Sequence, residues 1–164
     1  MSDKFDAVYK LKRAGKNKVA LSLLVDQKTG RIKKPYNDDL NHAWYTVGDI
    51  YYKGKEYYKA INAFKKAFMN WSDDVESLWA IANCYSEIGK SWLTKYYLEK
   101  AIQLSGEKDG LRYNLGNALF DMGKYREAIK QYKKVRSKDK QLYKLACSNI
   151  KKAEKLVKMS STSM

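Results

Sequence analysis

The chain has 164 residues and a formal net charge of +15 at pH 7, with 45% hydrophobic residues, two cysteines and one proline. This length suits one folded unit with a real core. No stretch approaches the roughly 20 apolar residues of a membrane span, and the polar start lacks a secretion signal, so a cytoplasmic protein is expected. Cys84 and Cys147 lie far apart without metal-ligand spacing, so neither a disulfide framework nor a zinc site is predicted.

Residues 1–40 are interpreted as an N-terminal helical segment followed by a polar insertion. Apolar residues within 4–27 are compatible with a degenerate helical hairpin, but the sequence does not decide whether this is a true repeat. Residues 26–39 are polar and rich in turn formers, and a helix is not expected to continue through Pro35.

The centre of the chain repeats with a period of 34 residues, from Asn41 to Leu142. The copies are 41–74, 75–108 and 109–142. Each predicts a first helix with residues of one face at i, i+3, i+4 and i+7: Trp44, Val47, Gly48, Tyr51; Leu78, Ile81, Ala82, Tyr85; Arg112, Leu115, Gly116, Leu119. Each also predicts a second helix with a ladder of one large residue between two smaller ones: Ala60, Phe64, Ala67; Thr94, Leu98, Ala101; Ala128, Tyr132, Val135.

A glycine–lysine pair separates the two helices in every copy. The pairs are Gly54–Lys55, Gly89–Lys90 and Gly123–Lys124. Because glycine tolerates a positive φ, these pairs are interpreted as turns between antiparallel helices. At the end of the chain, apolar residues at helical spacing predict a capping helix over 143–159, followed by a disordered tail over 160–164.

The pattern Trp44-x-x-Val47-Gly48-x-x-Tyr51, followed by Ala60-x-x-x-Phe64, resembles the tetratricopeptide-repeat family. The resemblance covers three tandem repeats, about 100 residues, although the usual proline near the repeat end is replaced by Ser72, Gly106 and Lys140. It implies an all-α fold, a right-handed α-solenoid of antiparallel helical hairpins. Its concave groove, lined by the first helices, would bind a peptide or helix of another protein.

One face of the first helices supplies the candidate groove residues. In each repeat an aromatic residue occupies the same position of the first helix, and a side chain that can hydrogen-bond a peptide backbone follows one helical turn later. The candidates are Tyr45, Asp49, Tyr52, Trp79, Asn83, Ser86, Tyr113, Asn117 and Phe120. Packing of adjacent first helices is the alternative interpretation. The resemblance also implies a comparison with the basic clamp that holds acidic heat-shock tails; Tyr45, Asp49 and Ala80 do not match that clamp, so no specific binding of such tails is expected.

The positive charge is concentrated at the two ends of the chain. A basic patch is predicted at Lys130, Lys133, Lys134, Arg136, Lys138 and Lys140, on the convex side. It is interpreted either as a solvated face or as a surface for nucleic acid or another polyanion. Trp92, at the start of a second helix, is interpreted as a homodimer contact, as part of a second partner surface, or as a residue packed against a neighbouring loop.

The sequence contains few features of an enzyme active site. The single histidine, His42, lacks a defined acid partner and is interpreted as a surface residue of the groove. No phosphate loop, paired-carboxylate motif or metal-ligand spacing occurs, so neither an enzyme nor a cofactor is expected. The prediction is an adaptor or co-chaperone that binds a partner protein, with a polyanion-binding module as the alternative.

Overall fold

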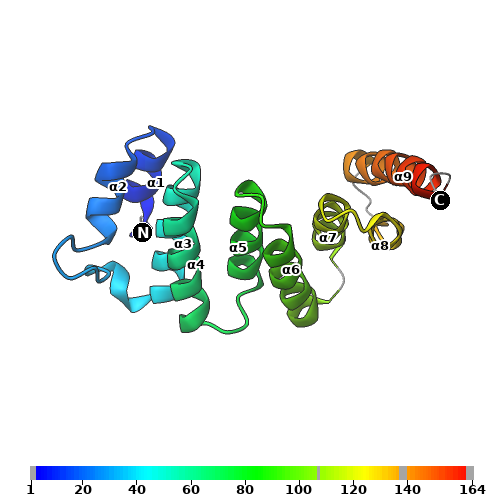
Figure 1. The fold of residues 1–164 in the computed structure, drawn as a ribbon. Coiled ribbons are helices and arrows are strands. Elements are labelled where there is room, and N and C mark those ends of the chain that lie inside the picture. Colours follow the sequence, from blue (N-terminus) through cyan, green and yellow to red (C-terminus); the bar gives the residue numbers. More distant parts are fainter. Residues whose placement is uncertain (1–2, 107, 137–139, 162–164) are drawn as a thin grey trace. The chain divides into compact units, whose positions relative to one another are not determined.

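The computed structural model describes residues 3–106, 108–136 and 140–161. Within these ranges the helices are joined by turns and loops, and the one β interaction is an isolated antiparallel bridge between Val25 and Ile32 (Figure 1). The helices are α1 (Asp6–Arg13), α2 (Asn17–Leu24), the short 3-10 helix η1 (Tyr36–Asp38), α3 (Leu40–Lys53), α4 (Tyr57–Asn70), α5 (Val75–Glu87), α6 (Ser91–Ser105), α7 (Asp109–Asp121), α8 (Tyr125–Tyr132) and α9 (Lys140–Ser161). They form two compact units, Met1–Cys84 and Tyr85–Met164, whose boundary falls within α5.

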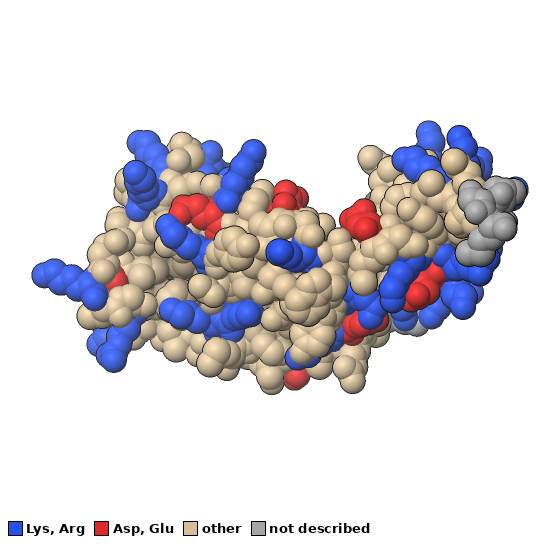
Figure 2. All heavy atoms as spheres, in the orientation of Figure 1, with Lys and Arg blue, Asp and Glu red and all other residues tan. Residues whose placement is uncertain are grey.

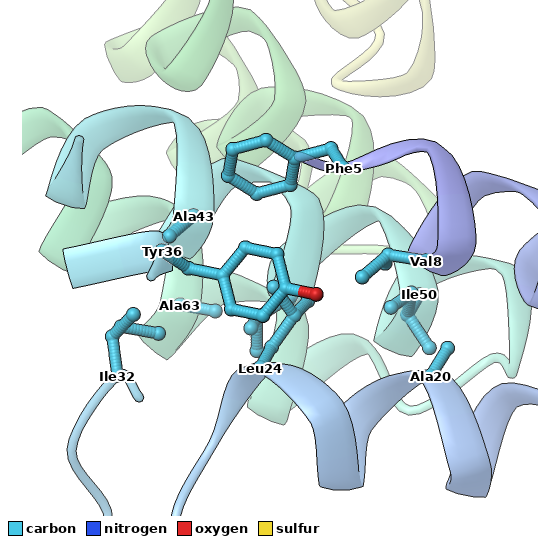
Figure 3. Close-up of a cluster of buried hydrophobic side chains, with 10 residues drawn as sticks. Phe5, Val8, Ala20, Leu24, Ile32, Tyr36, Ala43, Ile50 and Ala63 are labelled. Atoms are coloured by element: carbon cyan, nitrogen blue, oxygen red, sulfur yellow. The ribbon is translucent and has the colours of Figure 1, made fainter. Parts of the chain in front are cut away.

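The core of the first unit joins the N-terminal helices to α3 and α4. Figure 3 shows Phe5, Val8 and Leu24 in one cluster with Ile50 of α3, and all four side chains are buried. Two further members of this cluster, Ile32 and Tyr36, come from the segment that the sequence analysis assigned to a polar insertion. Sequence polarity alone does not identify them, because each is a single apolar residue among lysines and aspartates. The insertion therefore contributes to the core as well as to the surface.

A similar turn occurs four times between consecutive helices. Gly15, Gly89 and Gly123 have φ values of +70°, +69° and +73°, and the equivalent residue of the first predicted repeat is Lys55, with φ +59°. In each turn the next backbone N–H donates to a carbonyl five residues earlier, with N···O distances of 2.8–2.9 Å. The prediction that Gly54 supplies the left-handed residue is wrong, because Gly54 has φ −76° and precedes the left-handed position by one residue. Lys55 adopts a conformation that disfavours any residue with a Cβ.

Glycines in the first helices allow close contact with the large residue of the following helix. A Cβ built on Gly48 would lie 2.6 Å from the Phe64 ring, and one on Gly116 would lie 2.5 Å from the Tyr132 ring. The predicted small–large–small ladders of the second helices are buried in all three copies. Each aromatic residue thus requires a glycine opposite it, which explains why both types recur together.

The second unit contains α6 to α9. Helix α7 packs against α6 and α8, and α9 packs mainly against α8. The buried Arg112 of α7 donates from Nη1 to Gln131 Oε1 at 2.8 Å. Helix α8 ends at Tyr132, before Val135, which was expected within it but is nevertheless buried.

The C-terminal helix is longer than the sequence pattern indicates. Whereas residues 143–159 were predicted to be helical, α9 spans Lys140–Ser161. Residues 160 and 161, assigned to a disordered tail, are therefore helical. Residues 162–164 lie outside the described part of the chain.

Candidate functional site

Four of the predicted groove residues line one cavity in the first unit. Tyr45, Asp49 and Tyr52 reach it from α3, and Asn83 reaches it from α5. Phe64 and Ala80 complete its wall, and the cavity measures about 130 Å³. We call these six residues and the space between them the α3 pocket. The predicted i, i+4, i+7 face of α3 thus lies beside a hollow, as a binding face would.

Aromatic side chains form the floor of the α3 pocket. The ring centroids of Tyr45 and Phe64 lie 5.2 Å apart, and Phe64 is held in place by its contact with the buried Gly48. Burial raises the pKa of Tyr45 to about 12, and the nearby carboxylates of Glu76, Asp49 and Asp74 act in the same direction. Tyr45 therefore remains a neutral hydrogen-bonding group at physiological pH.

The polar rim of the α3 pocket is partly engaged within the chain. Asp49 forms ion pairs with Lys12 of α1 at 2.5 Å and with Lys53 at 3.7 Å. The amide of Asn83, in contrast, forms no hydrogen bond with any described residue and is partly exposed. Asn83 is thus the rim group available to pair with the backbone or a polar side chain of a guest.

Trp79 does not line the α3 pocket, although the sequence pattern grouped it with the groove residues. Its side chain is half-buried, and its indole Nε1 is buried with no acceptor among the described residues. A buried N–H donor without a partner is unfavourable for folding. The structure offers no contact that assigns Trp79 to a binding surface, so its role in binding stays a prediction.

The remaining groove candidates lie in the second unit, and all of them except Tyr113 line another cavity. Ser86, Asn117 and Phe120 line a hollow of about 320 Å³ together with Asp121, Tyr132, Asn149 and Lys152. Burial raises the pKa of the Asp121 carboxyl group.

Helix α9 engages two of the predicted third-repeat residues. Asn149 donates from Nδ2 to Asn117 Oδ1 at 3.1 Å and to Tyr113 Oη at 3.3 Å. Asn117 Oδ1 also accepts a 2.8 Å hydrogen bond from Tyr132 Oη. Tyr113 and Asn117, which were expected to meet a guest, thus have partners within the chain. Asn83 of the α3 pocket has no such bond to a described residue, which makes the α3 pocket the better candidate site.

The predicted basic patch is exposed wherever the structure describes it. Lys130 lies on α8, Lys133, Lys134 and Arg136 follow that helix, and Lys140 begins α9. Lys138 lies outside the described residues. Figure 2 shows Lys and Arg side chains projecting from the surface in view with far fewer Asp and Glu.

His42 is packed more closely than the sequence analysis expected. Its Nε2 lies 2.5 Å from Tyr9 Oη, and its ring meets the Phe5 ring edge-on at 4.4 Å. This half-buried histidine belongs to the packing between α1 and α3 rather than to an open groove surface. The described residues include no group of three or more His, Cys, Asp or Glu placed to hold a metal ion. Among the helices of the described ranges, none is long and apolar enough to cross a membrane.

Comparison with known families supports the pattern seen in the sequence and the fold. Two tetratricopeptide-repeat profiles match the chain, one at residues 42–69 and one at residues 111–141. The chain contains tetratricopeptide repeats in these two segments. The two matches lie within the first and third predicted repeats, while the number of repeats stays a prediction. No protein in a search of curated sequences matches the chain.

Solved structures of tetratricopeptide-repeat proteins share this fold. The protein MamA matches with a TM-score of 0.70 and 22% identity, over 94% of this chain and 86% of that one. YrrB, described as having an unusual peptide-binding site, matches with a TM-score of 0.64 and 21% identity, over 91% of this chain and 70% of that one. The second repeat domain of human RPAP3, in complex with the HSP70 peptide SGPTIEEVD, matches with a TM-score of 0.61 and 21% identity, over 70% of this chain and 98% of that one. These similarities confirm the predicted all-α helical-repeat fold class.

Proposed function

We propose that this tetratricopeptide-repeat protein is a protein-interaction module of the adaptor or co-chaperone type, and that its α3 pocket receives a side chain of a partner peptide. The observation that carries the proposal is that four sequence-predicted groove residues converge on one cavity. In addition, several solved relatives with this fold were determined with bound peptides, or are described as peptide-binding.

The dimensions and lining of the α3 pocket indicate what kind of side chain it takes. A volume of about 130 Å³ corresponds to about four water molecules at roughly 30 Å³ each. This is room for one aliphatic side chain of moderate size, resting on the rings of Tyr45 and Phe64. The free amide of Asn83 then pairs with the backbone of the guest, so that apolar burial gives affinity and the amide fixes register.

The α3 pocket is unsuited to an acidic anchor. Its lining contains the carboxylate of Asp49 and no lysine or arginine. The cations nearest to Asp49, Lys12 and Lys53, are already engaged in ion pairs with it. We therefore expect the HSP70 peptide SGPTIEEVD, which human RPAP3 binds, not to bind this chain specifically. A micromolar response in a calorimetric titration with that peptide would contradict this expectation.

A substitution that fills the α3 pocket with a larger side chain tests the proposal. Peptides are first selected from a random-sequence display library on the full chain, and their affinities are measured by fluorescence anisotropy. The variant Ala80→Phe places a ring in the α3 pocket and is expected to weaken binding by more than tenfold, a loss of about 1.4 kcal/mol. The matched control is Ala7→Phe, on the exposed surface of α1 in the same unit.

A second variant separates blocking from misfolding. Asn83→Ala leaves the cavity open and removes only the amide, so it is expected to weaken binding while the helical circular dichroism stays unchanged. If the library yields no binder, or if the selected peptides bind Ala80→Phe as tightly as the parent chain, the proposal is wrong.

The exposed basic patch supports a second candidate function, binding of nucleic acid or another polyanion. The five described residues of the patch are exposed and follow one another within a short stretch of chain. Binding through such a patch falls steeply with salt because counterions are released. A gel-shift series from low to high salt, repeated with the double variant Lys130→Glu/Lys133→Glu, measures the affinity for nucleic acid. An affinity that changes neither with salt nor in the double variant would exclude binding through this patch. Ala80→Phe is expected to leave the affinity for nucleic acid unchanged.

A further inference from the structure

A second cavity opens on another face of α3, within the first unit. It measures about 230 Å³ and shares no lining residue with the α3 pocket. Its apolar walls are formed by Val25 after α2, by Trp44, Val47 and Tyr51 of α3, and by Ala63 of α4. We call this cavity the Trp44 pocket. Concave sites with apolar and aromatic walls and a few polar groups are typical of ligand binding.

The Trp44 pocket exists because α2 is short. Helix α2 packs against α3 but has only 8 residues, whereas α4 and α6, the second helices of the first two predicted repeats, have 14 and 15. The chain leaves the helix at Val25, which is extended and pairs with Ile32, so a loop replaces the turns that would continue α2. Leu78 and Arg112 are buried at the repeat position of Trp44, whereas Trp44 itself is only partly buried. A ring that is covered in the other copies thus borders an open cavity here.

Two exposed lysines of α4 bring positive charge to the Trp44 pocket. Lys66 Nζ lies 4.0 Å from the centroid of the Trp44 ring, and Lys59 Nζ lies 5.5 Å from the centroid of the Tyr51 ring. Contact with the face of a ring holds an ammonium group in place without neutralising its charge. Lys59 also pairs with Glu56 at 2.5 Å, whereas Lys66 forms no ion pair with any described residue. Because no aspartate or glutamate lines the pocket, Lys66 offers an unpaired cation beside apolar walls.

We propose that the Trp44 pocket binds an apolar carboxylate, that is, an aromatic or branched aliphatic group that carries one carboxylate. A volume of about 230 Å³ corresponds to about eight water molecules at roughly 30 Å³ each, which is room for one ring with a short acidic arm. The ring packs on Trp44 and Ala63, and the carboxylate meets Lys66. A free aromatic acid and an apolar residue at the C-terminus of a polypeptide both carry this chemistry.

The two kinds of contact contribute unequally to binding. Burial of an apolar group is worth more than an exposed ion pair, so the walls supply most of the affinity and the ammonium group supplies selectivity. The neutral amide of the same compound is therefore expected to bind about threefold to fivefold more weakly than the acid at low salt. Added salt screens the exposed charge and reduces that difference. The α3 pocket has the opposite expected preference, because the carboxylate of Asp49 lines it.

An NMR titration of the full ¹⁵N-labelled chain tests the proposal, with N-acetylphenylalanine and its neutral amide as probes. The chain has four tryptophans, and the variant Trp44→Phe assigns the indole N–H signal of Trp44. We expect both probes to shift that signal, with the acid binding about threefold to fivefold more tightly. The indole of Trp92, which is 61% exposed and does not line the Trp44 pocket, is expected to stay unshifted.

A third probe distinguishes the two sources of the ligand. It is a pentapeptide that ends in phenylalanine with a free carboxylate. If the natural ligand is a polypeptide C-terminus, the pentapeptide binds at least as tightly as N-acetylphenylalanine. If the natural ligand is a free acid, the pentapeptide binds more weakly. Either result supports an apolar carboxylate as the ligand.

Substitutions on α4 separate the charge from the apolar contact. Lys66→Gln removes the cation and keeps most of the side chain, so the acid is expected to bind no more tightly than the amide. The matched control Lys65→Gln removes a neighbouring exposed lysine that does not line the Trp44 pocket, and it is expected to keep the preference for the acid. Asn62→Trp fills the pocket from an exposed position and is expected to weaken the binding of both probes by more than tenfold.

Three results would overturn the proposal. Equal affinity of the parent chain for acid and amide at low salt would show that the ligand is not recognised as an anion. An indole signal of Trp44 that stays unshifted up to the solubility limit of both probes would exclude the Trp44 pocket as a binding site. Loss of binding in Ala80→Phe would show that the probes occupy the α3 pocket instead, whereas unchanged binding in that variant keeps the two sites distinct.

Discussion

Replacing Lys55 with glycine is expected to stabilise the protein. Lys55 has φ +59°, whereas glycine occupies the equivalent place in the other three turns, at positions 15, 89 and 123. A residue with a Cβ in this left-handed conformation costs about 1–2 kcal/mol. Glycine removes that cost but adds chain entropy to the unfolded state, which offsets roughly 0.5–1 kcal/mol. The net expectation for Lys55→Gly is an increase of about 1 kcal/mol in the free energy of unfolding.

The assay is urea and thermal unfolding followed by circular dichroism at 222 nm. For a chain of this size, 1 kcal/mol corresponds to a rise in Tm of about 2–4 °C. Lys55→Ala is the matched control, because it removes the same lysine but keeps the Cβ and so keeps the strain. Equal stabilisation by the two variants would show that the lysine side chain, and not its backbone conformation, is responsible, and the reasoning would fail.

Three other perturbations follow from the packing and the pKa shifts. Gly48→Ala is expected to destabilise by about 1–3 kcal/mol, because its Cβ would lie 2.6 Å from Phe64. The double variant Gly48→Ala/Phe64→Leu, which copies the alanine and leucine of the middle repeat, should recover part of that loss in urea unfolding. Asp74→Ala should lower the midpoint of thermal unfolding, because the buried carboxylate accepts hydrogen bonds from Ser77 N at 2.9 Å and Asn41 Nδ2 at 2.7 Å. Since folding raises the pKa of Tyr45 to about 12, its contribution to stability is present below pH 10 and is lost between pH 10 and 12. Tyr45→Phe should therefore show a smaller fall in stability over that interval, and an identical fall would contradict the assignment.

The repeat architecture was predictable from the amino-acid sequence because helix periodicity and repeat spacing are local properties. Apolar residues at 3.6-residue intervals, recurring every 34 residues, identified the first and second helices of each copy. The face of α3 that carries Tyr45, Asp49 and Tyr52 was predictable for the same reason, since residues at i, i+4 and i+7 of a helix lie together. A charge excess such as +15 is likewise a property of composition alone.

Tertiary structure decided which of these residues have partners. Lys12 pairs with Asp49 across 37 residues of sequence, and Asn149 bonds to Asn117 across 32. Neither pair lies within a repeat, so no periodic pattern indicates it. The buried Ile32 and Tyr36 were missed for a related reason, because burial depends on which helices cover a segment and not on the polarity of its neighbours. The conformation of Lys55 also needed coordinates, since the adjacent Gly54 obscured which residue takes the left-handed place.

The repeat unit, its helices and the faces they present follow from the amino-acid sequence, because they depend on interactions between residues close in the chain. Which polar groups remain available and where cavities form become known only from the folded chain. Those properties depend on contacts between distant segments, because a hydrogen-bonding group or an apolar face acquires a function only when the chain itself leaves it uncovered.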